Sequence, residues 1–198
     1  MRDVLSARVL AAVVFVLTVG QLLAGAFIPG LDQFAGKAFG ARLVAYPVLM
    51  LATPAVYAGL RRRRAGREPL PWNAFLLLML PFLIDVTGNT LDLYDAVFWW
   101  DDANHFANWA SLCGGAGLLM LRALPGLPAW AAVVLVTGTG SLLAVAWELA
   151  EWFTFIRFGT ELGTAYQDTL LDEALGTLGA LATGVLLAVR RRQSPPAA

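Results

Sequence analysis

The segment from Trp72 to Asp92 reads WNAFLLLMLPFLIDVTGNTLD, and it indicates the fold class of the whole chain. Its first part is almost wholly apolar, and its length is close to the roughly 20 residues that a helix needs to cross a bilayer. Polar groups gather toward its end, at Asp85, Asn89 and Asp92, which are spaced i, i+4, i+7 and would share one helical face. The segment therefore predicts a membrane-spanning helix with a polar face near one end.

The composition of the chain agrees with that interpretation. Hydrophobic residues make up 59% and charged residues 14% of the 198 positions, and the mean hydropathy is +0.67. Soluble domains are less apolar and carry more charge. Six segments qualify, or nearly qualify, as spans: Val9 to Ile28, Ala41 to Leu60, Trp72 to Asp92, Asp102 to Leu121, Pro128 to Glu148 and Asp168 to Val189. We expect an all-α, polytopic bundle of six transmembrane helices that forms a single membrane domain over residues 1–198.

The placement of arginine predicts the orientation of this bundle, because short cytoplasmic loops retain Lys and Arg. Eleven of the fourteen basic residues fall on one side if both termini are cytoplasmic, namely Arg2, Arg8, Arg61 to Arg64, Arg67, Arg122 and Arg190 to Arg192. We expect a multi-pass protein of the bacterial plasma membrane with its N and C termini in the cytoplasm. In an alternative for the first span, Ala24-Gly25-Ala26 resembles the cleavage site of a signal peptide.

The acidic residues gather on the opposite side. Twelve of the fourteen carboxylates and the only histidine fall there. Counting about 1.5 Å per helical residue from the inner boundaries places Asp85, His105, Glu148 and Asp172 about 20 to 30 Å into the membrane. The hydrocarbon core is roughly 30 Å thick, so four helices would contribute polar groups to one layer near its outer boundary.

This concentration of negative charge predicts a bound counter-charge. Several carboxylates in a small volume repel one another, so some must be protonated or neutralised by a cation. Arg157 is the one basic residue that the sequence places near them. The expected metal ligands are Asp85, Asp101, His105, Glu148, Glu151, Asp168 and Asp172, and the pocket would also include Asn89, Asp92 and Asp102. Such oxygen-rich ligands favour Mg, Mn or Ca before Zn or Fe.

Structural interpretations of the same residues remain open. Asp168 and Asp172 suit the start of a helix, where carboxylates cap the backbone and complement the helix dipole. Glu148 and Glu151 lie between tryptophans and suit a solvated interfacial belt. Asp85 is the hardest to explain in this way, because it lies deepest and has no role at a helix end.

Small residues in the last three spans predict close helix packing in lipid. They are Gly114, Gly115 and Gly117 in the fourth span, Gly138 and Gly140 in the fifth, and Gly176, Ala180 and Gly184 in the sixth. That packing would allow His105, Glu148 and Asp172 to meet.

The motifs of the C-terminal half resemble those of a known family. They are Asp101-x-x-x-His105-Phe106, Glu148-x-x-Glu151, and Asp168-x-x-x-Asp172 followed by Gly176-Thr177-Leu178-Gly179-Ala180. In this pattern the chain resembles the YjdF-like family of small bacterial integral membrane proteins. It is more distantly similar to VanZ-like proteins, from which it departs at Glu151 and at Ala174 to Leu175. The resemblance supports a polar site in the membrane more than it supports any particular activity.

The functional hypotheses follow from the predicted pocket and from missing motifs. The sequence has no Gly-rich phosphate loop, G-x-S-x-G, H-E-x-x-H or Cys-x-x-Cys motif, and we expect no nucleic-acid partner. The leading hypothesis is an outward-facing pocket that binds a cation and the polar head group of an amphiphilic envelope component. As an enzyme, the protein would be a metal-dependent membrane hydrolase or transferase in which His105 moves a proton and Glu148 or Asp172 holds metal or activates water. The alternatives are a proton- or cation-coupled transporter and a non-catalytic membrane scaffold with a structural polar network.

Overall fold

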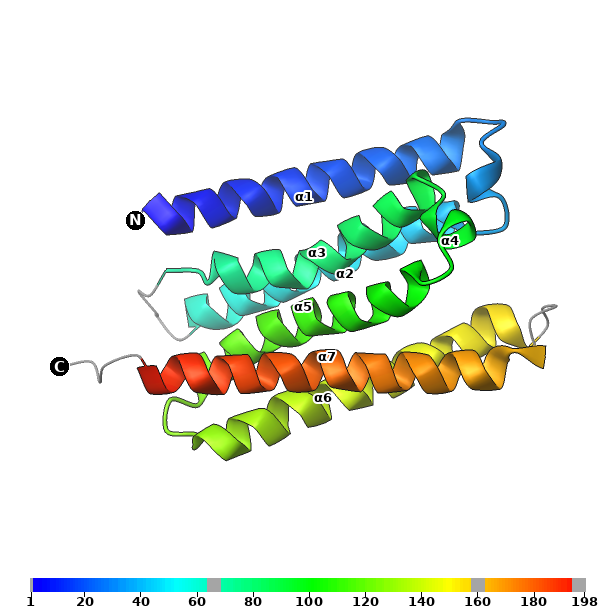
Figure 1. Cartoon of the computed structure of the whole chain (residues 1–198). Helices are drawn as coiled ribbons and strands as arrows, with labels where there is room; N and C mark the ends of the chain where they lie inside the picture. The colour runs from blue at the N-terminus through cyan, green and yellow to red at the C-terminus, as the bar shows by residue number, and fades with distance from the viewer. Residues whose placement is uncertain (1, 64–68, 158–162, 194–198) are drawn as a thin grey trace. The chain divides into compact units, whose positions relative to one another are not determined.

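The computed structural model describes residues 2–63, 69–157 and 163–193, and every long element in those ranges is a helix (Figure 1). In chain order the elements are α1 (Arg2–Phe27), η1 (Asp32–Phe34), α2 (Phe39–Arg63), α3 (Trp72–Thr90), α4 (Leu93–Ala96), α5 (Trp100–Ala123), α6 (Ala129–Glu151), η2 (Trp152–Ile156) and α7 (Ala165–Gln193). The element η2 is a π-helical turn that continues α6. Apolar runs form helices because lipid offers no partner for backbone N–H and C=O groups. The all-α prediction is confirmed.

The helices group into two compact units, residues 1–100 and residues 101–198. The first unit holds α1, α2, α3 and α4, and the second holds α5, α6 and α7. Each unit has its own packing and its own polar side chains. The single membrane domain over residues 1–198 stays a prediction.

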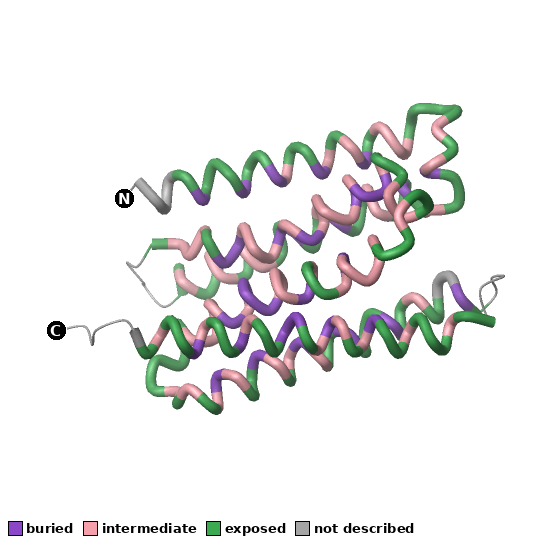
Figure 2. The backbone as a smooth tube through the Cα atoms, in the orientation of Figure 1, coloured by how far each residue is buried: buried purple, intermediate pink, exposed green. Residues whose placement is uncertain are grey.

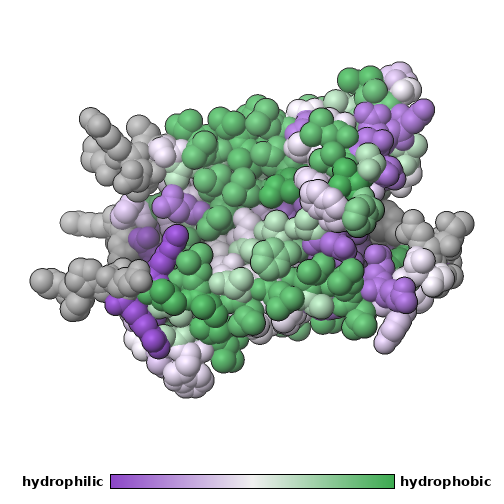
Figure 3. Space-filling view, viewed as in Figure 1, coloured by the Kyte–Doolittle hydropathy of each residue, from purple (hydrophilic) through white to green (hydrophobic). Residues whose placement is uncertain are grey.

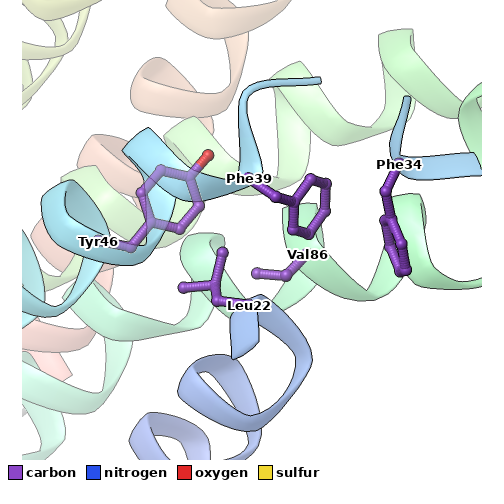
Figure 4. Close-up of a cluster of buried hydrophobic side chains, with 5 residues drawn as sticks. All are labelled: Leu22, Phe34, Phe39, Tyr46 and Val86. Atoms are coloured by element: carbon purple, nitrogen blue, oxygen red, sulfur yellow. The ribbon is translucent and has the colours of Figure 1, made fainter. Parts of the chain in front are cut away.

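The first unit is built around apolar side chains from α1, α2 and α3. One cluster consists of Leu22, Phe34, Phe39, Tyr46 and Val86, drawn as sticks in Figure 4. A second cluster lies along the same three helices and consists of Ala11, Val14, Met50 and Met79. Between helices, the Gln21 side chain of α1 donates a hydrogen bond to the Thr87 hydroxyl of α3. The core thus packs α1 against both α2 and α3, which positions the polar end of α3.

Close packing through small residues holds the second unit together. A Cβ atom on Gly179 of α7 would overlap the backbone of α5 at Phe106 and Ala110. A Cβ atom on Gly140 of α6 would overlap Ala180 of α7. The absence of side chains at these glycines brings the three backbones near one another, as small residues do in membrane helices. The predicted packing of the last three helices is confirmed.

Gly138 is the exception among the predicted packing glycines. A Cβ atom added there would meet nothing within 4 Å. The helical repeat explains this result, because residues 138 and 140 are about 200° apart around α6 and cannot both face α7. The prediction for Gly138 was therefore wrong, whereas Gly140, Gly176 and Gly184 lie at helix contacts.

Five helices in the described residues are long and apolar enough to cross a membrane. They are Ser6–Phe27, Phe39–Arg63, Trp72–Thr90, Ala129–Glu151 and Ala165–Arg192. The predicted span from Asp102 to Leu121 is helical, as part of α5, but it does not belong to this group. The count of six spans and the cytoplasmic termini stay predictions.

Each unit exposes many large apolar side chains, as expected for helices that face lipid. Exposed residues alternate with buried ones along the helices, so one side of each helix packs inward (Figure 2). Apolar residues cover the middle of the helices, and hydrophilic residues concentrate toward their ends (Figure 3). Basic residues occupy the last turns of α2, α5 and α7. Arg64 and Arg67 of the predicted basic set lie outside the described residues.

Candidate functional site

The candidate site of the second unit is formed by Asp101, His105 and Asp172, which we call the Asp–His cluster. Asp101 and His105 lie one turn apart at the start of α5, and Asp172 lies in the second turn of α7. The side chains are 47%, 12% and 4% exposed, respectively. The cluster therefore runs from an accessible carboxylate to a nearly buried one.

The distances within the Asp–His cluster suit ligands of one ion. His105 Nε2 lies 3.5 Å from Asp172 Oδ1 and 3.8 Å from Asp101 Oδ1. One potential ligand atom from each residue lies within 4.8 Å of the other two. Ligands of one octahedral ion with bonds of about 2.1 to 2.4 Å are about 3 to 3.4 Å apart when adjacent and about 4.2 to 4.8 Å apart when opposite. The three ligand atoms are thus too far apart for strong direct hydrogen bonds and near enough to share a cation.

Further carboxylates surround the cluster. The side chains whose negative charge acts on Asp172 are Asp101, Asp168, Glu148 and Glu151. The Glu148 side chain is itself buried and accepts a hydrogen bond from Thr169. Asp102 interacts electrostatically with His105. The acids that the sequence predicted for the last three helices therefore do gather in one part of the second unit.

His105 lies beside the buried Asp172 carboxylate. In the described part of the chain, it is the one basic side chain within 4.0 Å of Asp172. Among those same residues, the Nδ1 atom of His105 is buried and has no hydrogen-bond partner. A single imidazole cannot neutralise several carboxylates, so some of them must be protonated or neutralised by a cation.

Helix packing positions the cluster. Gly179 lets α7 approach the backbone of α5 at Phe106, one residue beyond His105. Nearby, a Cβ atom on Gly176 would lie 2.7 Å from the Trp109 ring. Gly176 is one turn beyond Asp172, and Trp109 is one turn beyond His105. Close contact at these two levels therefore brings the side chains of Asp172 and His105 together.

Asp85 belongs to a different polar network, in the first unit. Its Oδ2 atom accepts hydrogen bonds from Arg42 Nη1 at 2.8 Å and from Tyr46 Oη at 2.7 Å. Its Oδ1 atom accepts from Tyr94 Oη at 3.0 Å and from Asn89 Nδ2 at 3.3 Å. The carboxylate thus has four donors and a full counter-charge from protein groups.

The Arg42 contact corrects the prediction that Arg157 is the one basic residue near the predicted acids. Arg42 forms an ion pair with Asp85, and both side chains are mostly buried. Arg157 lies over the ring of Phe153. An arginine in a predicted span signals a charge partner, but sequence alone does not say which acid it meets.

Asp92 does not share the helical face of Asp85 and Asn89, which corrects a second prediction. Helix α3 ends at Thr90, and Asp92 has a left-handed backbone with φ of 58° before α4 begins. This turn breaks the i, i+7 relation and leaves Asp92 exposed. It also directs α4 so that Tyr94 reaches Asp85. Tyr46 and Tyr94 are site residues that the sequence analysis missed, because tyrosines near span ends usually mark the membrane interface.

An ion pair in the first unit joins a loop to the short helix α4. Lys37 Nζ is 2.6 Å from Asp95 Oδ2. The hydrogen bond from the Lys37 ammonium, followed by its charge, lowers the pKa of Asp95 below its usual value. The pair thus connects the loop before α2 with the short helix α4.

Comparison with known proteins identifies the family. The family model described as "Predicted membrane protein (DUF2238)" matches residues 8–193. This match is consistent with the YjdF-like resemblance, since YjdF is a member of that family, whereas no finding bears on the VanZ-like likeness. No curated protein and no solved structure matches the chain. Together with its five candidate spans, the match over nearly the whole chain shows that this integral membrane protein belongs to the DUF2238 family of predicted membrane proteins.

Proposed function

We propose that the protein binds a divalent cation in the Asp–His cluster and that the bound ion holds the polar head group of an amphiphile. The observation that carries the proposal is the convergence of Asp101, His105 and Asp172, whose ligand atoms lie within 4.8 Å of one another. The neighbouring acids reinforce the argument, because a divalent ion would relieve their mutual repulsion. Asp85 is not part of the proposed ligand set, since Arg42 already provides its counter-charge.

The ligand chemistry narrows the choice of ion. Two carboxylates suit Mg, Mn and Ca, whereas the imidazole suits Zn and Fe as well. Mn²⁺ accepts both carboxylate and imidazole ligands, so it is the first ion that we would test. The accessible Asp101 side chain leaves one side of the site approachable, which suits an ion that also coordinates an external oxygen atom.

The location of the cluster supports a head group as the external ligand. The cluster lies at the ends of α5 and α7 that are opposite their arginines. If α5 crosses the membrane in addition to the five candidate spans, the positive-inside rule predicts that the cluster lies toward the outer face of the plasma membrane. A bound ion would polarise a phosphate or carbonyl oxygen of the head group. His105 and Glu148 could exchange protons with such a ligand, as a hydrolase or transferase would require.

A metal titration of the purified protein tests the proposal. After chelator treatment, we expect Mn²⁺ at 100 times its Kd to stabilise the folded protein by about 2.7 kcal/mol. The experiment would compare Mn²⁺, Mg²⁺, Ca²⁺ and Zn²⁺ by thermal unfolding and by isothermal titration calorimetry.

The variant Asp172→Asn makes the test specific. We expect it to preserve the stability of the metal-free protein and to abolish the stabilisation by metal. Without metal, the variant should be at least as stable as the wild type, since it removes one negative charge from a group of five. With metal, it should gain no stability. Asp102→Asn is the matched control, because Asp102 is outside the cluster on the same helix turn, and it should retain most of the stabilisation. Equal metal binding by Asp172→Asn and the wild type would refute the proposed site, as would the absence of binding by every ion.

A further inference from the structure

A groove lies between α6 and α7 in the second unit, at the opposite ends of these helices from the Asp–His cluster. Its volume is about 200 Å³. The lining residues are Ala129, Trp130, Val133, Val185, Ala188, Val189 and Arg192. All but Arg192 are apolar, and Arg192 lies in the last turn of α7. The groove is therefore apolar along most of its length, with a positive charge at one end.

The crossing of α6 and α7 explains why the groove exists. The two helices approach closely at Gly184, where an added Cβ atom would lie 3.3 Å from the Cα and carbonyl oxygen atoms of Val133. They then diverge toward the start of α6 and the end of α7 (Figure 1). Ala188, which is buried and small, lies in this diverging region. From Val185 to Arg192 the groove extends about 10 Å along the helix axis.

The arginines at this end of α7 have different roles. Arg191 Nη1 donates a hydrogen bond to the Leu127 carbonyl oxygen at 2.8 Å and so holds the connection between α5 and α6. Arg192 is exposed and lines the mouth of the groove. Trp130, which is 70% exposed, lies on the other wall. Tryptophan at this position is typical of the boundary between lipid tails and head groups.

We propose that this groove is a binding site for a phospholipid with an anionic head group. Part of one acyl chain lies against Val133, Val185 and Val189, and the phosphate pairs with Arg192. The charge of Arg192 selects an anionic head group, because each basic residue near the membrane surface contributes to attraction of anionic lipid. The groove walls restrict the acyl chain to one place, which distinguishes this site from the diffuse attraction of a basic cluster.

Native mass spectrometry tests the site. The full chain would be transferred from bilayer nanodiscs of phosphatidylcholine with increasing phosphatidylglycerol, and the lipids retained per protein would be counted. We expect the wild type to retain phosphatidylglycerol in preference to phosphatidylcholine, and Arg192→Gln to weaken phosphatidylglycerol binding about fivefold. Arg63→Gln is the matched control, because it removes an exposed arginine from the last turn of α2. It should leave the preference unchanged.

A second pair of variants tests the apolar part of the groove. Val189→Trp would fill the groove from its rim and should also reduce phosphatidylglycerol retention, whereas Leu186→Trp would alter an exposed position that does not line it. Thermal unfolding of each variant would verify that it is folded. The proposal would be overturned if Arg192→Gln and Arg63→Gln lost phosphatidylglycerol binding equally. An equal loss of phosphatidylglycerol retention in Val189→Trp and Leu186→Trp would also overturn it. A dimer that excludes lipid from the groove, or the lack of any head-group preference, would overturn it as well.

Discussion

Asp85 lies within a membrane-spanning helix and is held by donors from three helices. Arg42 and Tyr46 come from α2, Asn89 from α3 and Tyr94 from α4. The side chain is 20% exposed. In such surroundings an ionised carboxylate is retained because its lone pairs and charge are satisfied, and removing its charge leaves Arg42 without its partner.

We therefore expect Asp85→Asn to lower the free energy of unfolding by about 2 kcal/mol, which is typical for a hydrogen bond to a charged group. Denaturant or thermal unfolding in the same detergent would measure the change. Asp92→Asn is the control, because Asp92 is exposed, and it should change stability by no more than about 0.5 kcal/mol. Adding Arg42→Gln to Asp85→Asn should cost less than the sum of the two single changes. Additive effects would show that the two side chains do not stabilise each other.

The acid and its donors were not equally predictable. An aspartate at position 85, in an otherwise apolar segment, predicts a compensated charge from the sequence alone. The identity of its partner depends on how α2 faces α3, because Arg42 is 43 positions away. Tyr94 was also beyond prediction, because its approach depends on the left-handed backbone at Asp92.

At the scale of helices, α7 lies close to the backbone of α5. Thr183 Oγ1 donates a hydrogen bond to the Ala110 carbonyl oxygen at 2.9 Å. Gly179 lies one turn earlier on α7 and faces Phe106 and Ala110. The contact tolerates no added side chain at Gly179, because the atoms it would meet belong to the backbone and cannot rotate away.

We expect Gly179→Ala to reduce the free energy of unfolding by about 2 kcal/mol, since overpacking forces the helices apart. Gly138→Ala provides the matched control, because nothing lies within 4 Å of its added Cβ atom. It should leave stability unchanged or raise it, as alanine favours helix more than glycine does. Thermal unfolding of the two variants would measure the difference. If the two variants changed stability by the same amount, the inferred close approach of α5 and α7 would be wrong.

Helices and their contacts differ in how far they follow from sequence. The run from Trp72 to Leu80 predicts a helix because its composition and length leave few alternatives in lipid. Small residues in α6 predict that some contact exists but not which of them make it. Gly140 lies against α7 and Gly138 does not, although both are small and only two positions apart.

At the scale of the whole molecule, the open question of five or six spans depends on α5. Its 24 residues begin with two acids and end with Arg122, which matches the charge distribution of a spanning helix. Its polar residues include Asn104, which is buried, and Asn108, which donates a hydrogen bond to Asn104. These side chains lower the hydropathy of α5 although they face the protein interior, so we predict that α5 crosses the membrane.

Labelling of introduced cysteines in intact cells with a membrane-impermeant maleimide would determine the topology. We expect Phe98→Cys, in the exposed segment before α5, to react from outside. Gly126→Cys, in the exposed loop after α5, should react only after permeabilisation. The wild-type chain is the control, because its single Cys113 is buried. Reaction of both variants from the same side would mean that α5 does not span the membrane.

The sequence by itself determined that the chain is helical, that it lies in a membrane and that its acids and arginines concentrate at opposite helix ends. These properties follow from local composition and from the length of each apolar run. Only the tertiary structure decided which charges meet. It assigned Arg42 to Asp85 and brought Asp101, His105 and Asp172 together. The physical reason is that membrane depth depends on position along one helix, whereas lateral proximity depends on how neighbouring helices rotate and pack.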